Sequence, residues 1–273
     1  MSSLKNKFTC LADLPSMPTL LLEAIQQING KQNLMTLVDT IAQDPSMTIR
    51  ILHVVNSPFY GMSREIGSLR EAIILLGLNR IRDMLISICF SKMLSTQHKN
   101  FDYRQLWHHS MAVAECTRQL ADLSGNNRDF AFTAGLLHDI GHLVIVTLFP
   151  DEFSRIINEP DSPLAETEQR IFGFNHVEIG SKAAQYWNLP VAIQEAIEQH
   201  ETPPEPGAVK SLGLLVYAAD LCITKAEQSD ESSFLDKYEP IRAALAILNV
   251  SIDQAVNCIN SGRQFADQFL TLS

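Results

Sequence analysis

A histidine–aspartate pair stands inside one of the most apolar parts of the sequence, the stretch AFTAGLLHDIGHL from Ala131 to Leu143. His138 and Asp139 are adjacent, and His142 follows His138 by four residues. Residues four apart on a helix share a face, so His138 and His142 are expected to face one space, with Asp139 about 100° away. Imidazole and carboxylate groups can bind a divalent metal or act as an acid–base pair. These three residues are therefore the candidate catalytic residues.

The simpler alternative is that a histidine on an apolar helix only hydrogen-bonds a backbone carbonyl. For His142 two interpretations stay open, an outer partner or substrate contact of a metal site, or a polar position on the surface. His108 is expected to be a solvated or capping residue.

Further histidines and carboxylates occur at the ends or faces of separate predicted helices. Five of these groups lie in apolar settings, where burying an unpaired ion is unfavourable. Asp220 lies in LGLLVYAADLCI and has few polar neighbours in sequence. A buried carboxylate needs a cation, a metal or several donors, although an aspartate that caps a neighbouring helix is the alternative. The candidate metal ligands are His109, His138, Asp139, His176, His200 and Asp220.

The elements that must position these groups are predicted to be helices. Apolar residues recur at helical spacing in short segments, and strand-like alternation is not sustained anywhere. The sequence therefore predicts an all-α fold, a multi-helix bundle. Ser46 is the expected N-cap of one helix and Asn175 of another, and residues 34–45 and 131–143 are each expected to be helical.

The chain divides by pattern into four segments. A lead-in over 1–13 precedes an N-terminal helical half over 14–100. The half that carries the candidate ligands covers 101–228, and a C-terminal helical extension covers 229–273.

Composition limits the class of protein. The chain has 273 residues, 46% hydrophobic and 19% charged, as in soluble globular proteins. A net charge of −10 counts against nucleic acid as a partner. The five cysteines form no CxxC pair, which indicates reduced thiols. Without a signal-peptide pattern or an apolar run of about 20 residues, we expect a cytoplasmic protein that has no membrane partner.

Five segments of the sequence together resemble the HD superfamily of metal-dependent phosphohydrolases. In chain order they are WHHSMAVA, LLHDIGHL, FNHVEIG, EQHE and AADLC. The first half carries LPSMPTLLLEAI, IAQDPSMTIRILHVVNSPFYG and IGSLREAIILLGLNRIRDMLI, which look like the N-terminal half of the HDOD family. This family is an HD-related output domain of bacterial signalling proteins. The resemblance covers roughly residues 14–225 and implies an HD-like core joined to an N-terminal helical half.

Carried over by position, His109, His138, Asp139 and Asp220 match the core metal ligands of the HD pattern. His176 and His200 match the additional histidines of relatives that bind two metals. The resemblance thus implies one or two divalent ions, and a mixed histidine and carboxylate set suits iron, manganese, zinc, nickel or cobalt.

The sequence also departs from the HD-GYP relatives, which cleave cyclic di-GMP. Those relatives have His-His-Glu where this chain has Gln199-His200-Glu201, and lysine in place of His142. Their Gly-Tyr-Pro loop is absent from the sequence. These differences count against cyclic di-GMP as the substrate.

Two functions follow from the resemblance. The first is a signalling protein with a divalent-metal site in its helical core, acting through a signalling protein partner or a ligand. The alternative is an active metal-dependent phosphohydrolase on a nucleotide or other phosphoester. Arg64, Arg70, Arg80 and Arg82 could clamp a phosphate or a partner's carboxylates, but such arginines more often form a solvated face.

Overall fold

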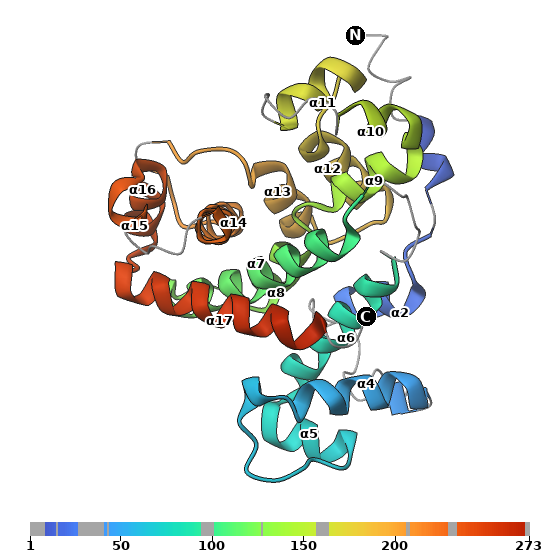
Figure 1. Cartoon of the computed structure of the whole chain (residues 1–273), viewed down its shortest axis with the longest axis vertical. Coiled ribbons are helices and arrows are strands. Elements are labelled where there is room, and N and C mark those ends of the chain that lie inside the picture. Colours follow the sequence, from blue (N-terminus) through green and yellow to red (C-terminus); the bar gives the residue numbers. More distant parts are fainter. Residues whose placement is uncertain are drawn as a thin grey trace.

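Every regular element in the described part of the chain is helical, as the computed structural model in Figure 1 shows. The structure describes residues 9–14, 16–26, 41–42, 44–93, 101–126, 128–156, 164–205, 208–228 and 234–270. The prediction of an all-α fold is therefore confirmed. The helix predicted over 34–45 falls largely outside the described residues.

The N-terminal half contributes short helices around one long helix. In chain order they are η1 (Thr9–Asp13), α2 (Thr19–Gln26), α4 (Pro45–Val55), η3 (Pro58–Tyr60), α5 (Leu69–Leu76) and α6 (Leu78–Met93). Helix α6 packs against α2, α4 and α5, and it also contacts α8 of the second half. It therefore joins this half to the rest of the molecule.

The start of α4 differs from the sequence prediction. Asp44, and not Ser46, is its N-cap, because the Asp44 carboxylate accepts a hydrogen bond from the Met47 N–H at 3.1 Å. Pro45 takes the first helical position, where a missing N–H has no consequence. The proline thus fixes the helix start earlier than Ser46 would.

The second half supplies the helices that carry the candidate ligands. They are α7 (Tyr103–Ser124), α8 (Arg128–Leu137), α9 (Ile140–Leu148), α10 (Pro150–Ile156), α11 (Leu164–Phe172), α12 (His176–Tyr186), α13 (Val191–Gln199) and α14 (Leu212–Gln228). Asn175 caps α12 in a complete capping box with Glu178, as predicted for Asn175. This cap fixes His176 as the first residue of the helix.

The C-terminal extension packs on the same core. It consists of α15 (Phe234–Lys237), α16 (Glu239–Leu248) and α17 (Ile252–Leu270). Helix α17 lies along α7, and Figure 1 shows the two running side by side. A Cβ at Gly262 would lie 2.6 Å from the Ala112 carbonyl oxygen, so this glycine permits the close approach. One cluster of buried residues runs through both halves and the extension.

The prediction of one helix through residues 131–143 is wrong. Helix α8 ends at Leu137, His138 and Asp139 form a turn, and α9 begins at Ile140. Asp139 has φ −95° and ψ 17°, outside the helical region, so the turn aims its carboxylate differently from a continuous helix.

The segment Phe130–Leu148 has the length and the mean hydropathy, 1.5, of a membrane-crossing helix. However, 78% of its most apolar window is buried inside the protein, and the polar turn at His138 and Asp139 interrupts it. The segment is a core element of the bundle.

Helices α9 and α12 approach closely because of one glycine pair. A Cβ at Gly141 would lie 1.9 Å from the His176 carbonyl oxygen, and a Cβ at Gly180 would lie 3.1 Å from the Gly141 nitrogen. Because neither glycine has a side chain, the two helices lie close enough for the rings of His142 on α9 and His176 on α12 to stack, with their centroids 4.0 Å apart.

Candidate metal centre

All six predicted ligands and His142 meet in one place, together with a carboxylate that the sequence analysis did not select, Glu201. Their possible ligand atoms form four overlapping groups of three, each within 4.8 Å. These groups are His109–His138–Asp220, His138–Asp139–His200, Asp139–His142–His176 and His176–His200–Glu201. The eight residues come from α7, the α8–α9 turn, α9, α12, the end of α13 and α14. We call them the His–carboxylate cluster.

Asp139 lies at the middle of the cluster. Its Oδ2 is 3.3 Å from His138 Nε2, and its Oδ1 is 3.3 Å from His200 Nε2, 3.7 Å from His176 Nε2 and 3.8 Å from His142 Nε2. Burial raises the pKa of Asp139, but His138 and His142 lower it more, to well below its usual value. A charged carboxylate is thus surrounded by four imidazole rings.

Asp220 lies on the side of the cluster that includes His109. Its Oδ1 is 3.1 Å from His109 Nε2 and 3.8 Å from His138 Nε2, and it accepts a hydrogen bond from the Thr224 hydroxyl at 3.1 Å. Glu227 Oε2 contacts His109 Nδ1 at 3.2 Å. Burial lowers the pKa of His109, but the hydrogen bonds with Asp220 and Glu227 raise it more, to well above 6.5.

The rings of His138 and His200 are fixed by backbone carbonyls. His138 Nδ1 donates to the Gly135 carbonyl at 2.8 Å, and His200 Nδ1 donates to the Ile197 carbonyl at 2.7 Å. In a neutral imidazole this leaves a lone pair on each Nε2. Both Nε2 atoms are buried without a hydrogen-bond partner.

The positions of these histidine nitrogens relative to the Asp139 oxygens indicate whether a metal ion fits the cluster. A lone pair on His138 Nε2 and an oxygen of Asp139, 3.3 Å apart, repel each other unless a cation lies between or beside them. The cation can be a proton on the imidazole or a metal ion. Histidines whose Nδ1–H is held by a carbonyl or carboxylate and whose Nε2 faces the site are typical of metal ligands. The residues present therefore fit a divalent metal.

Glu168 of α11 orients two further rings. Its Oε2 accepts hydrogen bonds from His176 Nδ1 at 2.7 Å and from the His176 backbone N–H at 2.8 Å. Its Oε1 lies 3.1 Å from His142 Nδ1, although this contact lacks hydrogen-bond geometry. Burial raises the pKa of Glu168, but the contacts with His142 and His176 lower it more, to about 2. One buried carboxylate thus orients the His176 imidazole by hydrogen bonds and forms an ion-pair contact with that of His142.

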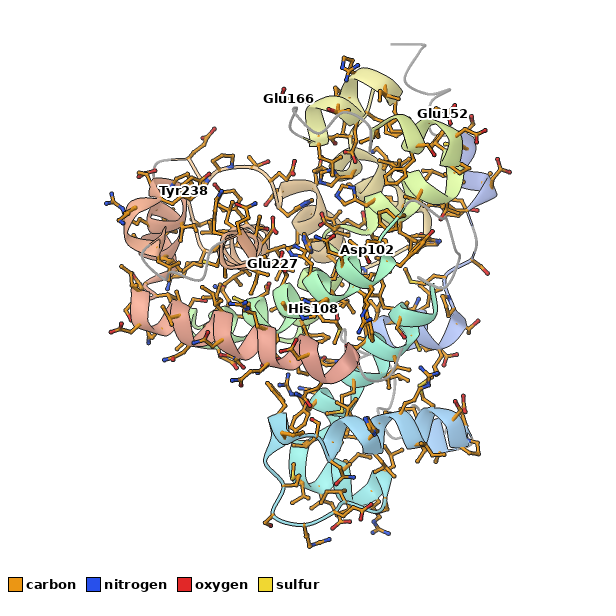
Figure 2. All side chains as sticks on the ribbon, viewed as in Figure 1. Asp102, His108, Glu152, Glu166, Glu227 and Tyr238 are labelled. Carbon is orange, nitrogen blue, oxygen red and sulfur yellow. The ribbon has the colours of Figure 1, made fainter. Side chains whose placement is uncertain are left out.

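The sequence analysis missed Glu168, Glu201 and Glu227. Glu227 follows Asp220 by seven residues, two helical turns, so the shared face was a usable signal. Glu201 directly follows His200, which was a second signal. Nothing in the sequence distinguishes Glu168, which contacts the cluster, from Glu166 on the same polar helix. As predicted, His108 lies outside the cluster. Its Nε2 is 3.0 Å from Asp267 Oδ1 of α17, and Figure 2 labels His108.

The HDOD domain family model matches residues 14–203 of this sequence. The chain belongs to the HDOD family. The match ends before α14, so Asp220 and Glu227 lie beyond the matched region. The resemblance inferred from the sequence segments is thereby confirmed.

Known proteins agree with this assignment. An HDOD domain protein of unknown function from Geobacter sulfurreducens superposes with a TM-score of 0.82 at 25% identity, and 98% of each chain is covered. A structure from Shewanella amazonensis, provisionally named a phosphohydrolase, gives a TM-score of 0.77 at 20% identity over 96% of this chain and 97% of that one, a likeness of fold alone.

Two curated relatives are longer than this chain. An uncharacterized protein of Treponema pallidum is 28% identical over 253 residues, 89% of this chain and 47% of that protein. Ribonuclease Y of Latilactobacillus sakei is 29% identical over 206 residues, 75% of this chain and 33% of that protein. The chain thus spans half or less of the length of these relatives.

Proposed function

We propose that this HDOD protein binds one or two divalent transition-metal ions at the His–carboxylate cluster and hydrolyses a phosphoester there. The observation that carries the proposal is the pair of buried Nε2 atoms of His138 and His200, which make no hydrogen bond and each lie 3.3 Å from an oxygen of Asp139. A neutral imidazole nitrogen that faces a carboxylate oxygen is unfavourable unless a cation lies beside it, and a divalent ion would supply that cation.

The cluster offers ligands at two ends, and Asp139 lies between them as a member of two of the four groups. His109, His138 and Asp220 would hold an ion at one end. Around the other end lie His142, His176, His200 and Glu201. The mixture of imidazole and carboxylate suits iron, manganese, zinc, nickel or cobalt. A bound divalent ion would lower the pKa of a coordinated water and polarise a phosphoryl oxygen.

The chain's own residues orient and shield the site. His138, His176 and His200 are 0%, 3% and 1% exposed, so water is excluded from their side of the cluster. The side chains of Glu201, beside His176, and Glu227, beside His109, are 44% and 33% exposed, so solvent reaches the cluster at these two residues. A substrate would approach the cluster from this exposed side of Glu201 or Glu227.

The relatives support a phosphoester as the substrate class. Ribonuclease Y is named for action on RNA, and its match covers most of this chain. The net charge of −10 counts against RNA itself as the substrate. A nucleotide or another small phosphoester is therefore the class that we propose.

A signalling role is the second candidate. The resemblance to bacterial output domains supports a protein that binds a signalling partner or a ligand, with the metal holding the helices together. The near-complete burial of His138, His176 and His200 favours this candidate, because a closed site can keep a metal without turnover.

The test begins with the full chain purified without chelator or nickel resin. We expect elemental analysis to find one or two equivalents of a transition metal. Asp139→Ala is expected to lose the metal and remain helical by circular dichroism. Asp151→Ala, a change of an exposed carboxylate on α10, is the matched control and should keep it. Unchanged metal content in Asp139→Ala would contradict the proposed site.

Hydrolysis is tested with bis(p-nitrophenyl) phosphate and p-nitrophenyl phosphate. We expect turnover that depends on metal, persists in Asp151→Ala and disappears in Asp139→Ala. Bound metal without turnover on these and a panel of nucleotides would favour the signalling candidate. Turnover of equal size in Asp139→Ala would place the chemistry elsewhere.

A further inference from the structure

Helix α14 contributes more than one side chain to the region around His109. Asp220, Thr224 and Glu227 are spaced four and then three residues apart, so they share one face of the helix. The Thr224 hydroxyl donates to Asp220 Oδ1 at 3.1 Å, and the two Glu227 oxygens lie 3.3 and 3.2 Å from His109 Nδ1. This face of α14 therefore supplies a candidate ligand, a donor that orients this ligand, and a partner for His109.

The two ring nitrogens of His109 have different carboxylate partners. Nε2 is 3.1 Å from Asp220 Oδ1, whereas Nδ1 is 3.2 Å from Glu227 Oε2. His109, His138 and Asp220 form one of the groups that could hold a metal, and we call this group the His109 end of the cluster. An ion bound there by Nε2 would replace the contact between Nε2 and Asp220. The contact with Glu227 is at the opposite nitrogen and can persist beside the ion.

The Glu227 contact also fixes which nitrogen of His109 can face a metal. An ionised carboxylate accepts hydrogen bonds and cannot donate them, so Nδ1 donates its proton to Glu227 and Nε2 is the nitrogen that can bind an ion. A carboxylate on the outer nitrogen of a metal-binding imidazole fixes the orientation of the ring and raises its basicity. Glu227 has this relation to His109.

The support of His109 differs from that of His138 and His200. In each of those two residues Nδ1 donates to a backbone carbonyl three residues earlier in the chain. Glu227 instead is a side chain from another helix, and 33% of it is exposed. The orientation of the His109 ring therefore depends on a group that can be reached from solvent.

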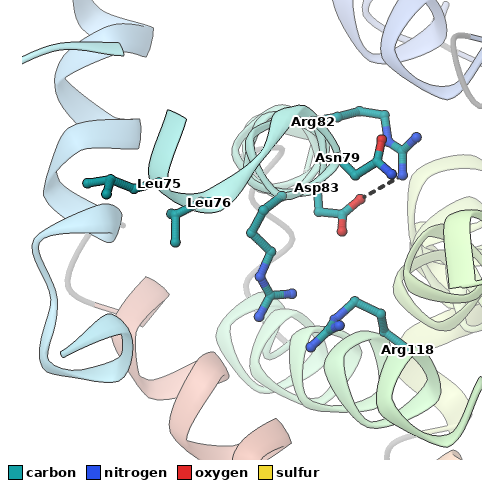
Figure 3. Close-up of a pocket in the computed structure, with 7 residues that line it drawn as sticks. Leu75, Leu76, Asn79, Arg82, Asp83 and Arg118 are labelled. Carbon is teal, nitrogen blue, oxygen red and sulfur yellow. Dashed lines mark hydrogen bonds and ion pairs between the residues drawn. The ribbon is translucent and has the colours of Figure 1, made fainter. Parts of the chain in front are cut away.

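The backbone of α7 is held independently of Glu227. Six residues after His109, the fully buried Glu115 pairs with Arg80 of α6 and with Arg118 of α7, with 2.6 Å from Glu115 Oε2 to Arg80 Nη1 and from Oε1 to Arg118 Nη2. Arg118 also lines the cavity among α5, α6 and α7 that Figure 3 shows. Loss of the Glu227 contact is therefore expected to free the His109 ring and to leave its helix in place.

We propose that Glu227 is a positioning residue for His109 and that, through it, the last turn of α14 sets the metal affinity of the His109 end of the cluster. The proposal rests on the proposed metal centre and adds a means of regulating it. Because Glu227 is partly exposed, a cation that pairs with its carboxylate at the surface would lower this affinity. Glu227 lies beyond the part of the chain that the HDOD family model matches.

The adjacent histidine supplies a matched control. His108 Nε2 is 3.0 Å from Asp267 Oδ1, and neither of these residues belongs to the cluster. Glu227→Ala and Asp267→Ala therefore each remove a partly exposed carboxylate from a histidine of α7, but only the first removes it from a candidate ligand. Glu227→Gln keeps an oxygen that can accept the Nδ1 proton.

Cobalt(II) is titrated into the metal-free full chain, and binding is followed by visible absorption and by chelator competition. We expect Glu227→Ala to bind one ion about 10–100-fold more weakly than Asp267→Ala does. Glu227→Gln should lose less, since a neutral hydrogen bond keeps about half the strength of a charge-assisted one. The absorption of bound cobalt should change in Glu227→Ala and not in Asp267→Ala, whereas the two metal-free variants should be equally stable in urea.

Three results would overturn the proposal. Equal cobalt affinity in Glu227→Ala and Asp267→Ala, with binding intact in the unchanged protein, would remove the role of Glu227 and leave the metal centre standing. Weaker binding that accompanies an equal loss of stability in the metal-free Glu227→Ala protein would assign Glu227 a structural role. Absence of metal binding by the unchanged protein would overturn the metal centre and this proposal together.

Discussion

Replacing Glu168 by glutamine changes one buried atom and is expected to remove one metal ligand. The Oε2 of Glu168 accepts two N–H groups from His176, so the amide oxygen of the glutamine must take that position. The amide NH2 then occupies the position of Oε1 and faces His142 Nδ1, now 3.1 Å from the carboxylate. This NH2 group favours the His142 tautomer whose Nδ1 is an acceptor and whose Nε2 carries the proton, and that Nε2 could not bind a metal.

The size of the effect follows from the weakened support of the two imidazole rings. The hydrogen bond from His176 Nδ1 changes from charge-assisted to neutral, which roughly halves its strength. Removing an outer partner of a metal ligand typically lowers metal affinity about 10–100-fold, or about 1.4–2.7 kcal/mol. We expect Glu168→Gln to fall in this range.

The assay is competition against a chromogenic chelator with zinc or manganese, supported by elemental analysis. Glu166→Gln is the matched control, since Glu166 lies two residues earlier on the same helix, outside the cluster, and is labelled in Figure 2. Metal affinity in Glu168→Gln within twofold of that in Glu166→Gln would refute the reasoning about ring orientation.

Two further predictions concern stability, both measured by urea denaturation. Gly141→Ala is expected to lower the free energy of unfolding by about 3 kcal/mol, because the new Cβ would lie 1.9 Å from a backbone oxygen of α12, whereas Gly67→Ala meets nothing within 4 Å. Burial raises the pKa of Glu115, but Arg80 and Arg118 lower it more, from 4.5 to about 2. Its ionised form therefore stabilises the fold fully above pH 4.5, with loss as the pH falls through 2, and Glu115→Gln should cost about 3 kcal/mol at pH 7.

Equal stability of the two alanine variants would show that α9 and α12 can separate without loss. For Glu115, the unchanged protein should lose stability between pH 4.5 and 2 by an amount that the glutamine variant lacks. Parallel pH profiles of the two proteins would contradict the assignment of this loss to Glu115.

The fold class could be predicted because apolar spacing directly reflects helix geometry. The cap at Asn175 was visible too, since asparagine followed three residues later by glutamate is a local signal. The start of α4 was misplaced by two residues, because Asp44 and Ser46 are both good caps and only Pro45 decides between them. Local chemistry thus predicted the helices better than their exact ends.

The break between α8 and α9 could not be predicted from its sequence. Neither glycine nor proline stands at His138 or Asp139, and apolar residues continue on both sides. The turn accompanies contacts of Asp139 with four imidazoles, two of which, His176 and His200, come from distant parts of the chain. Such tertiary contacts override local helix preference. As a result His138, Asp139 and His142 all face the cluster, whereas one straight helix would turn Asp139 away.

The candidate ligands were found because all are histidines or aspartates and five of the six lie in apolar settings. The glutamates that orient or complete the cluster were missed because each lies among polar residues on a helix or at its end. Arg118 was missed for the same reason, since RQLAD on α7 looks like an ordinary solvated face. Only the folded arrangement shows that Glu168 and Glu115 are fully buried.

The distance in sequence between the two sides of the cluster has a consequence for biosynthesis. His109 and Asp220 lie 111 residues apart in the chain, yet their side chains meet at 3.1 Å. At the ribosome's rate of about 5–20 residues per second, roughly 6–22 s pass between the synthesis of these two residues. During that interval the chain exposes histidines without the carboxylate that completes their group. If this end of the cluster binds a metal as proposed, a complete ligand group exists there only after the synthesis and docking of α14.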